Sequence, residues 1–174
     1  MPTLETPLIC VGLSSWRSLV TFMNKDYLYG KAIALWGIDA QVWVFIEEFG
    51  ELLQSFGHIK RRRPTNLIEE LADVQIMLDQ LIFYYFDGRD VTKLYEDCYV
   101  ELMGIDDQVW SFVTSVGNLL HSLRRGITPN IEMDLINTRL ILETLVVYFG
   151  KDSVNDVVDQ KLKRLEQIIR SFHE

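Results

Sequence analysis

An internal repeat constrains the fold of this chain more than any other feature of its sequence. The segment G-I-D-A-Q-V-W-V-F that begins at Gly37 returns as G-I-D-D-Q-V-W-S-F at Gly104. After a short deletion in the second copy, the match resumes with Tyr85-Phe86 against Tyr148-Phe149. A repeat of about 65 residues indicates two copies of one supersecondary unit that share a core.

Each copy is expected to be helical, because no segment shows the alternation of apolar and polar residues that is typical of a strand. Asp39 and Asp106 follow glycines and are expected to cap the next helix. We predict an all-α bundle of two tandem units, 36–102 and 103–174, related by a pseudo-two-fold axis, with a leading segment 1–35. The helices are expected at 14–35, 39–57, 65–86, 90–102, 106–124, 130–149 and 153–172.

The composition excludes several classes of protein. A content of 48% hydrophobic residues is enough for a buried core, whereas a net charge of −8 disfavours general binding to nucleic acid. No apolar run approaches the length of a membrane helix, and the N-terminal segment lacks the basic region of a signal peptide. Two cysteines without a partner spacing suggest a reducing compartment. We therefore expect a cytoplasmic protein that does not bind membranes.

Five carboxylates in the first copy are the candidate functional residues. Glu47, Glu48 and Glu51 form E-E-F-G-E, and Glu70 and Asp73 form E-L-A-D after 18 intervening residues. On antiparallel helices, these spacings place the acids where they could hold a hard divalent cation between them. The three acids of the first motif have an ordinary alternative, which is the solvated face of an amphipathic helix.

Two local observations favour a site over a solvated face. The arc that carries the first three acids also carries Trp43, Val44 and Gly50, which suggests a covered cleft. Glu70 lies at the edge of the apolar stripe of its helix, where a carboxylate is costly unless it is paired or bound to a metal. The arrangement therefore indicates that the acids face a partner or an ion.

The second copy serves as an internal control. Thr114, Ser115 and Asn118 stand where the first copy has its three glutamates, while the apolar framework is retained. The region that corresponds to Glu70 and Asp73 reads I-E-M-D-L-I-N-T-R-L and lacks E-x-x-D. All five acids are thus expected to be missing from the second copy, as they would be if they formed one functional set.

Oxygen ligands without cysteine or histidine favour Mg²⁺, or Mn²⁺ as a substitute, over zinc. Four or five carboxylates exceed the needs of one ion that keeps several waters. Their natural complement is two or more Mg²⁺ ions that carry a polyphosphate.

These motifs, with the continuation I-E-E-L-A-D-V-Q-I-M-L-D-Q-L, resemble the E-E-x-x-E and E-x-x-D motifs of the MazG-like, all-α nucleoside triphosphate pyrophosphohydrolases. The resemblance implies Mg²⁺-dependent hydrolysis between the α and β phosphates, which gives a nucleoside monophosphate and pyrophosphate. It also implies roles for the acids. Glu48, Glu51, Glu70 and Asp73 would bind metal, and Glu47 would be a further ligand or would orient the water, so that Glu47 and Glu48 are the candidate catalytic residues.

Contacts with the substrate are assigned to residues outside the acid motifs. Lys161 and Arg164 lie on the last expected helix, which resembles the lysine-bearing closing helix of the family, and a single composite site would use them to bind phosphates; ordinary surface pairing is the alternative. Arg63 could grip phosphates from its loop, although a hydrophilic connection is the preferred explanation. Trp43 could line a nucleobase pocket, although a place in the core or an interface is the more usual one for such a residue.

Two functions stay open at this point. The first is a pyrophosphohydrolase that limits a nucleotide pool, and the second is a nucleotide-binding or regulatory protein that uses the same metal cluster without useful turnover. A homodimer of the tandem chain is compatible with both.

Overall fold

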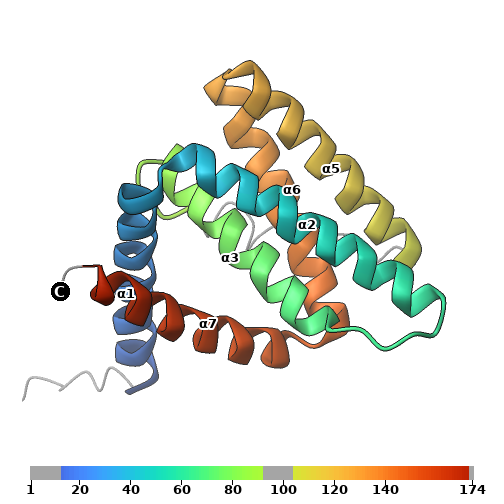
Figure 1. Ribbon diagram of the computed structural model, residues 1–174, viewed down its shortest axis with the longest axis horizontal. Coiled ribbons are helices and arrows are strands. Elements are labelled where there is room, and N and C mark those ends of the chain that lie inside the picture. Colours follow the sequence, from blue (N-terminus) through green and yellow to red (C-terminus); the bar gives the residue numbers. More distant parts are fainter. Residues whose placement is uncertain (1–12, 92–103, 173–174) are drawn as a thin grey trace, which may run out of the picture.

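The computed structural model describes residues 13–91 and 104–172, with side chains described from Lys25 onward. Within these residues the regular structure is entirely helical, which confirms the predicted all-α class (Figure 1). The helices are α1 (Leu13–Trp36), α2 (Ile38–Lys60), α3 (Leu67–Tyr85), α5 (Ile105–Arg125), α6 (Thr128–Phe149) and α7 (Lys151–Ser171). None of the described helices combines the length and apolar character that are needed to span a bilayer.

The predicted helix bounds agree with the observed ones to within three residues for these six helices. The predicted helix 90–102 lies outside the described residues except for Asp90 and Val91, which are not helical. The predicted capping aspartates were wrong. Gly37 and Gly104 occupy the N-cap positions, and Asp39 and Asp106 lie inside the first turn, where a carboxylate still faces the positive end of the helix dipole.

Helix α3 is the centre of the bundle. It contacts α1, α2, α6 and α7, and it buries residues around most of its circumference, among them Leu71, Val74, Leu78 and Leu81 (Figure 1). A helix that is apolar on several faces has to be covered by other elements on each of them. The core around α3 is one continuous cluster that includes residues of all six helices.

Single glycines make two of the sharp connections. Gly37 alone separates α1 from α2 and has a φ of 83°, and Gly150 alone separates α6 from α7 and has a φ of 119°. A side chain would strain the backbone at such positive φ angles, so these positions favour glycine. The turn at Gly150 directs α7 back across the bundle, where it lies against α3 and α1 (Figure 1).

The α2–α3 and α5–α6 hairpins are joined by aromatic and ionic contacts. The ring centroids of Phe49 and Phe112 lie 5.8 Å apart. The guanidinium of Arg139 on α6, whose side chain is only 8% exposed, donates to Asp79 of α3 at 2.9 Å. Arg139 also pairs with Glu143, which in turn accepts from Lys151 at the start of α7. The second hairpin is thus tied to the helix that carries Glu70 and Asp73.

The burial patterns of α3 and α6 match at a spacing of 64 residues. Leu67, Leu71, Val74, Leu78 and Leu81 are buried on α3, and Ile131, Leu135, Thr138, Leu142 and Leu145 are buried on α6. The alignment of Tyr85-Phe86 with Tyr148-Phe149 had placed the second copy one residue out of this register. Burial decides the register, because only this spacing directs both sets of side chains toward the core.

Candidate active site

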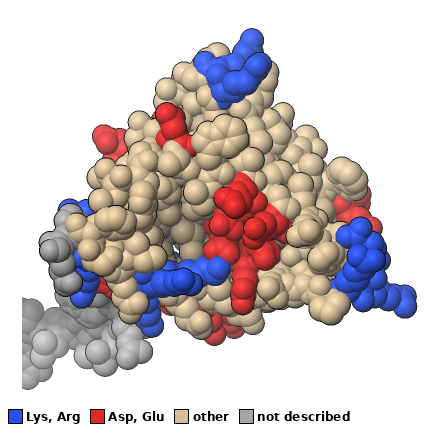
Figure 2. Space-filling view, viewed as in Figure 1, with Lys and Arg blue, Asp and Glu red and all other residues tan. Residues whose placement is uncertain are grey.

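Three of the predicted metal ligands converge between α2 and α3. Glu48 and Glu51 of α2 and Glu70 of α3 each offer a carboxylate oxygen, and these three oxygens all lie within 4.8 Å of one another. Figure 2 shows the acidic patch that α2 and α3 form on this face of the molecule. We refer to Glu48, Glu51, Glu70 and Asp73 as the carboxylate cluster.

The fourth member of the cluster, Asp73, is paired with a lysine from the other end of the chain. Lys161 Nζ on α7 donates to Asp73 Oδ2 at 2.5 Å, and both side chains are partly shielded from solvent. In Figure 2 a basic stretch reaches the edge of the acidic patch at the position of α7. The carboxylate cluster therefore has two acids from α2 and two from α3, and the ammonium group of Lys161 from α7 lies beside it.

The local sequence explains why these acids face one another. On α2, Phe45 and Leu52 are fully buried, and Glu48 lies between them one helical turn from each, at the border of the buried face. On α3, Glu70 and Asp73 flank the buried Leu71 and Ala72. Packing of α2 on α3 thus brings the two acid motifs together, although water would solvate each acid better.

The pKa values of Glu48, Glu70 and Asp73 in the cluster are raised because these carboxylates are partly removed from water. Burial, followed by the charges of Asp73 and Glu51, raises the pKa of Glu48 from its ordinary 4.5 to about 7. Burial, followed by Glu51, raises the pKa of Glu70. Burial also raises the pKa of Asp73, although the hydrogen bond and charge of Lys161 act in the opposite direction. Burial, together with mutual repulsion, favours either a proton or a cation among the four groups.

The donor set fits Mg²⁺. Oxygens bound to one octahedral Mg²⁺ at about 2.1 Å lie about 3 Å apart when adjacent and about 4.2 Å apart when opposite. The oxygens of Glu48, Glu51 and Glu70 are already within 4.8 Å of one another, so small side-chain rotations suffice to bring them to such an ion. Asp73 is close enough to affect the pKa of Glu48 and could join them if Lys161 left it.

The other predicted site residues lie outside the carboxylate cluster. Glu47 is exposed and lies outside the group of three glutamates. The cleft that was expected to cover the acid-bearing arc is not formed by the described residues, since Trp43 is 71% exposed, Val44 is 37% exposed and Gly50 has open space where a side chain would be. Trp43 therefore stands uncovered on the helix of the cluster, because no described element packs over that face of α2.

The two predicted arginines make no ion pair with the described residues. Arg164 is exposed, three residues beyond Lys161 on α7. Arg63 is exposed in the connection between α2 and α3, and Figure 2 shows the basic residues of that connection as a patch separate from the acidic one. Sequence reasoning missed Glu69, whose charge contributes to the raised pKa of Asp73. The signal for it was the adjacent pair of glutamates that opens α3.

The second hairpin carries a more neutral version of the same arrangement. Thr114, Ser115 and Asn118 lie at the positions of the three α2 glutamates, and the observed register places Asp134 and Asn137 at those of Glu70 and Asp73. The expectation that all five acids are missing was therefore wrong by one, because Asp134 keeps a carboxylate. That carboxylate accepts a hydrogen bond of 2.6 Å from Ser122.

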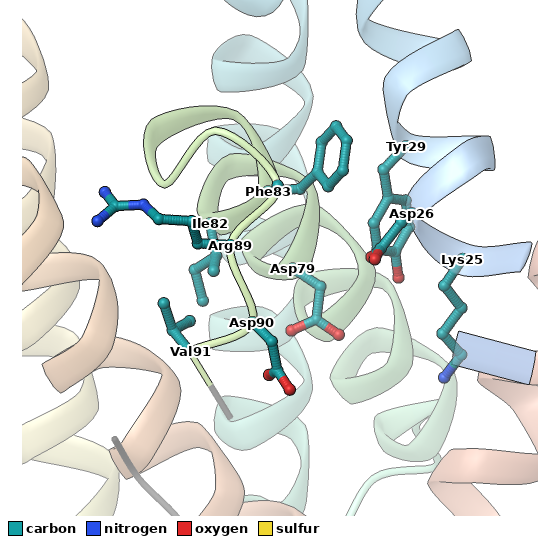
Figure 3. Close-up of a pocket in the computed structure, with 10 residues that line it drawn as sticks. Lys25, Asp26, Tyr29, Asp79, Ile82, Phe83, Arg89, Asp90 and Val91 are labelled. Atoms are coloured by element: carbon teal, nitrogen blue, oxygen red, sulfur yellow. The ribbon is translucent and has the colours of Figure 1, made fainter. Parts of the chain in front are cut away.

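A second group of acids lies between α1 and α3. Asp26, Asp79 and Asp90 gather around a pocket of about 90 Å³ (Figure 3). Burial, followed by Asp90 and Asp79, raises the pKa of Asp26, whereas Asp79 is engaged by Arg139. Ligand sites commonly have volumes of about 300–1,000 Å³, so this pocket is too small for a nucleotide. The carboxylate cluster of α2 and α3 is the better candidate site.

Comparison with known proteins adds no relative. No protein-family model, no curated protein and no solved structure matches this chain. The carboxylate cluster and the motifs that form it are therefore the features of this chain that point to a function.

Proposed function

We propose that the chain is a Mg²⁺-dependent nucleoside triphosphate pyrophosphohydrolase, which converts a nucleoside triphosphate into the monophosphate and pyrophosphate. The observation that carries the proposal is the convergence of Glu48, Glu51 and Glu70 within 4.8 Å, beside an Asp73 that is held by Lys161. Polyphosphates bind to proteins through Mg²⁺ and cationic side chains. This site offers carboxylate ligands for Mg²⁺, and Lys161 is a cationic side chain beside them.

The carboxylate cluster would bind the metal through Glu48, Glu51, Glu70 and Asp73, with Mn²⁺ as a possible substitute. Bound there, Mg²⁺ would neutralise the charge of the triphosphate and increase the electrophilicity of the phosphorus under attack. Four ionised carboxylates around one ammonium group leave three negative charges, which is why at least one divalent cation is needed before a triphosphate can approach.

We also expect Lys161 to contact the substrate. In the metal-free protein its ammonium group compensates Asp73. If Asp73 bound a divalent cation, the long side chain of Lys161 would be free to turn toward a phosphate oxygen of the substrate. Arg164 lies on the same helix and could contact a more distant phosphate, and Arg63 is available only to a substrate that extends to the α2–α3 connection.

Hydrolysis requires a group that accepts a proton from the attacking water. In the metal-free protein burial raises the pKa of Glu48 to about 7, near the range that suits a general base, and Glu48 would keep this role where the other three acids hold the metal. Glu47 is exposed at the preceding position of α2 and is the candidate that would orient the water from outside the metal ligands. In the overall reaction, the oxygen of water bonds to the α phosphorus, pyrophosphate leaves, and the water proton passes to the carboxylate.

The exposed indole of Trp43 offers a surface on which a nucleobase could stack, since it lies one helical turn before Glu47 on α2. It also offers a contact to a second copy of the chain, and a homodimer would cover this face.

We interpret the two hairpins as tandem copies of one unit, of which the first kept the acids. A cytoplasmic location suits this activity, because its proposed substrates and Mg²⁺ are abundant there.

The test is a screen of canonical and modified nucleoside triphosphates for release of pyrophosphate in the presence of Mg²⁺, with the E51Q/E70Q variant as the control. We expect turnover of at least one substrate by the unaltered chain and none by the variant. Tight, metal-dependent nucleotide binding without turnover of any substrate would favour the alternative, a regulatory protein that binds nucleotides through the same cluster.

A further inference from the structure

A groove between α5 and α6 includes the residues that the sequence repeat pairs with the carboxylate cluster. It has a volume of about 600 Å³, within the usual range for sites of small ligands. Its lining comes from α5 and α6 at positions that correspond to those of the carboxylate cluster, and it combines hydroxyl, amide and carboxylate groups with the apolar Leu140 and Ile141. The groove is not part of the proposed hydrolytic site.

Two residues that line the groove, Ser115 and Asp134, form hydrogen bonds between the two helices. Ser115 and Thr138 are buried and share a hydrogen bond of 2.7 Å, and Ser122 donates to Asp134 at 2.6 Å. These groups have satisfied one another, so their role is to fix the distance between α5 and α6. The groove is therefore a preformed feature of this hairpin.

The walls of the groove present groups that remain available. The side chains of Asn118 and Asn137 are exposed and form no hydrogen bond with the described residues. Each amide offers two donor hydrogens and an acceptor oxygen. Trp110 borders the groove with an indole that is 69% exposed, and Asp107 lies one helical turn before it.

The charges of the lining define what the groove can bind. None of the described residues that line it is a lysine or an arginine, so it has no cation to hold a phosphate. Asp134 is engaged by Ser122, and the remaining carboxylate, Asp107, is exposed, so the groove also lacks the convergent acids that would hold a metal ion bearing a triphosphate. The two carboxylates disfavour an anionic ligand, and a ligand that uses the indole and the two amides has a planar face, donors and acceptors.

We propose that the α5–α6 groove binds a nucleoside, with its base stacked on Trp110, the edge of the base hydrogen-bonded to Asn118 and Asn137, and a ribose hydroxyl donating to Asp107. Stacking of a base on an aromatic side chain and hydrogen bonding of its edge to an amide are the two contacts by which proteins read single bases. The groove thus offers contacts for a base and a ribose, whereas none of its described lining residues offers a cation for a phosphate.

Titration calorimetry of the full chain tests this inference. Adenosine, guanosine, cytidine and uridine are titrated separately in EDTA, so that no metal binds and no hydrolysis occurs. We expect at least one nucleoside to bind with a stoichiometry of one, and W110A and N137A each to weaken its binding by about tenfold. Both residues are exposed, so these variants should fold, which circular dichroism verifies.

The matched control is Y148A, which removes an exposed aromatic side chain of α6 that does not line the groove. Binding that Y148A leaves within about twofold of the original affinity, and that W110A weakens by about tenfold, supports the groove. Absence of binding by all four nucleosides, or a loss caused by Y148A to the same extent as by W110A, overturns it. Because the assay needs neither Mg²⁺ nor turnover, its outcome is independent of the proposed hydrolysis.

Discussion

Lys161 Nζ donates a hydrogen bond of 2.5 Å to Asp73 Oδ2, although 88 residues separate the two in sequence. The contact exists because α7 folds back after Gly150 and lies against α3. It joins the acid-bearing hairpin to α7.

Replacement of Lys161 by alanine should lower kcat for nucleoside triphosphate hydrolysis by about 10- to 100-fold, because a charged contact to the substrate would be lost. The same change should tighten binding of Mg²⁺, because Asp73 would no longer be shared with an ammonium group. Steady-state kinetics and Mg²⁺ titrations check the two effects. K163A is the matched control, since Lys163 is exposed on the same helix. Equal kcat values in K161A and the unaltered chain would contradict the role of Lys161.

The metal-free protein should lose stability as pH rises from about 5 to about 8. The pKa of Glu48 is about 7 in the folded state against an ordinary 4.5, so the folded state binds more protons between these values. The free energy of unfolding therefore falls with rising pH and levels off above the folded pKa. Urea unfolding in EDTA at a series of pH values measures this slope. E48Q should flatten it, whereas E47Q should not.

Addition of Mg²⁺ should reverse this loss. An ion that binds only the folded state stabilises it by about 2.7 kcal/mol at a concentration 100 times its dissociation constant. The effect should be larger at pH 8 than at pH 6, since the ion has to displace the proton of Glu48. Thermal unfolding with and without Mg²⁺ provides the measurement. A shift of equal size in E51Q/E70Q would show that the ion binds elsewhere.

Removal of the Arg139 side chain should destabilise the fold strongly. Arg139 is 8% exposed and pairs with Asp79 and Glu143, which would be left without this cation. Loss of one partner from a buried pair costs about 3–5 kcal/mol, and the partial exposure of the two acids suggests the lower end for R139L. R170A removes an exposed pair with Glu166 and should cost less than about 1 kcal/mol. Chemical unfolding of the two variants compares them, and similar losses would contradict the structural role of Arg139.

Much of the fold could be predicted from the sequence, because periodic apolar residues and a few glycine and proline breaks specify helices locally. The register of α6 could not, because Tyr148 and Phe149 imitate the Tyr85-Phe86 pair while burial places the match one residue later. Only the packing of Leu135 and Leu142 in the core distinguishes the two alignments.

Part of the candidate site could be predicted from local residue spacing. Residue spacing was sufficient to group Glu48, Glu51 and Glu70, since adjacent turns of two paired helices determine their proximity. The exposure of Trp43 was not predictable, because amphipathic patterns do not reveal whether another element covers a given face. The proximity of Lys161 to Asp73 was expected only in outline, since it depends on the path of α7 across the bundle.

Hydrolysis in ¹⁸O-labelled water, with products identified by mass spectrometry and phosphorus NMR, tests the proposed activity at the bond that is cleaved. With Mg²⁺ present, we expect nucleoside monophosphate and pyrophosphate, with the label in the monophosphate, and we expect loss of both products in E51Q/E70Q. Release of orthophosphate and nucleoside diphosphate, or pyrophosphate production that persists in E51Q/E70Q, would contradict it.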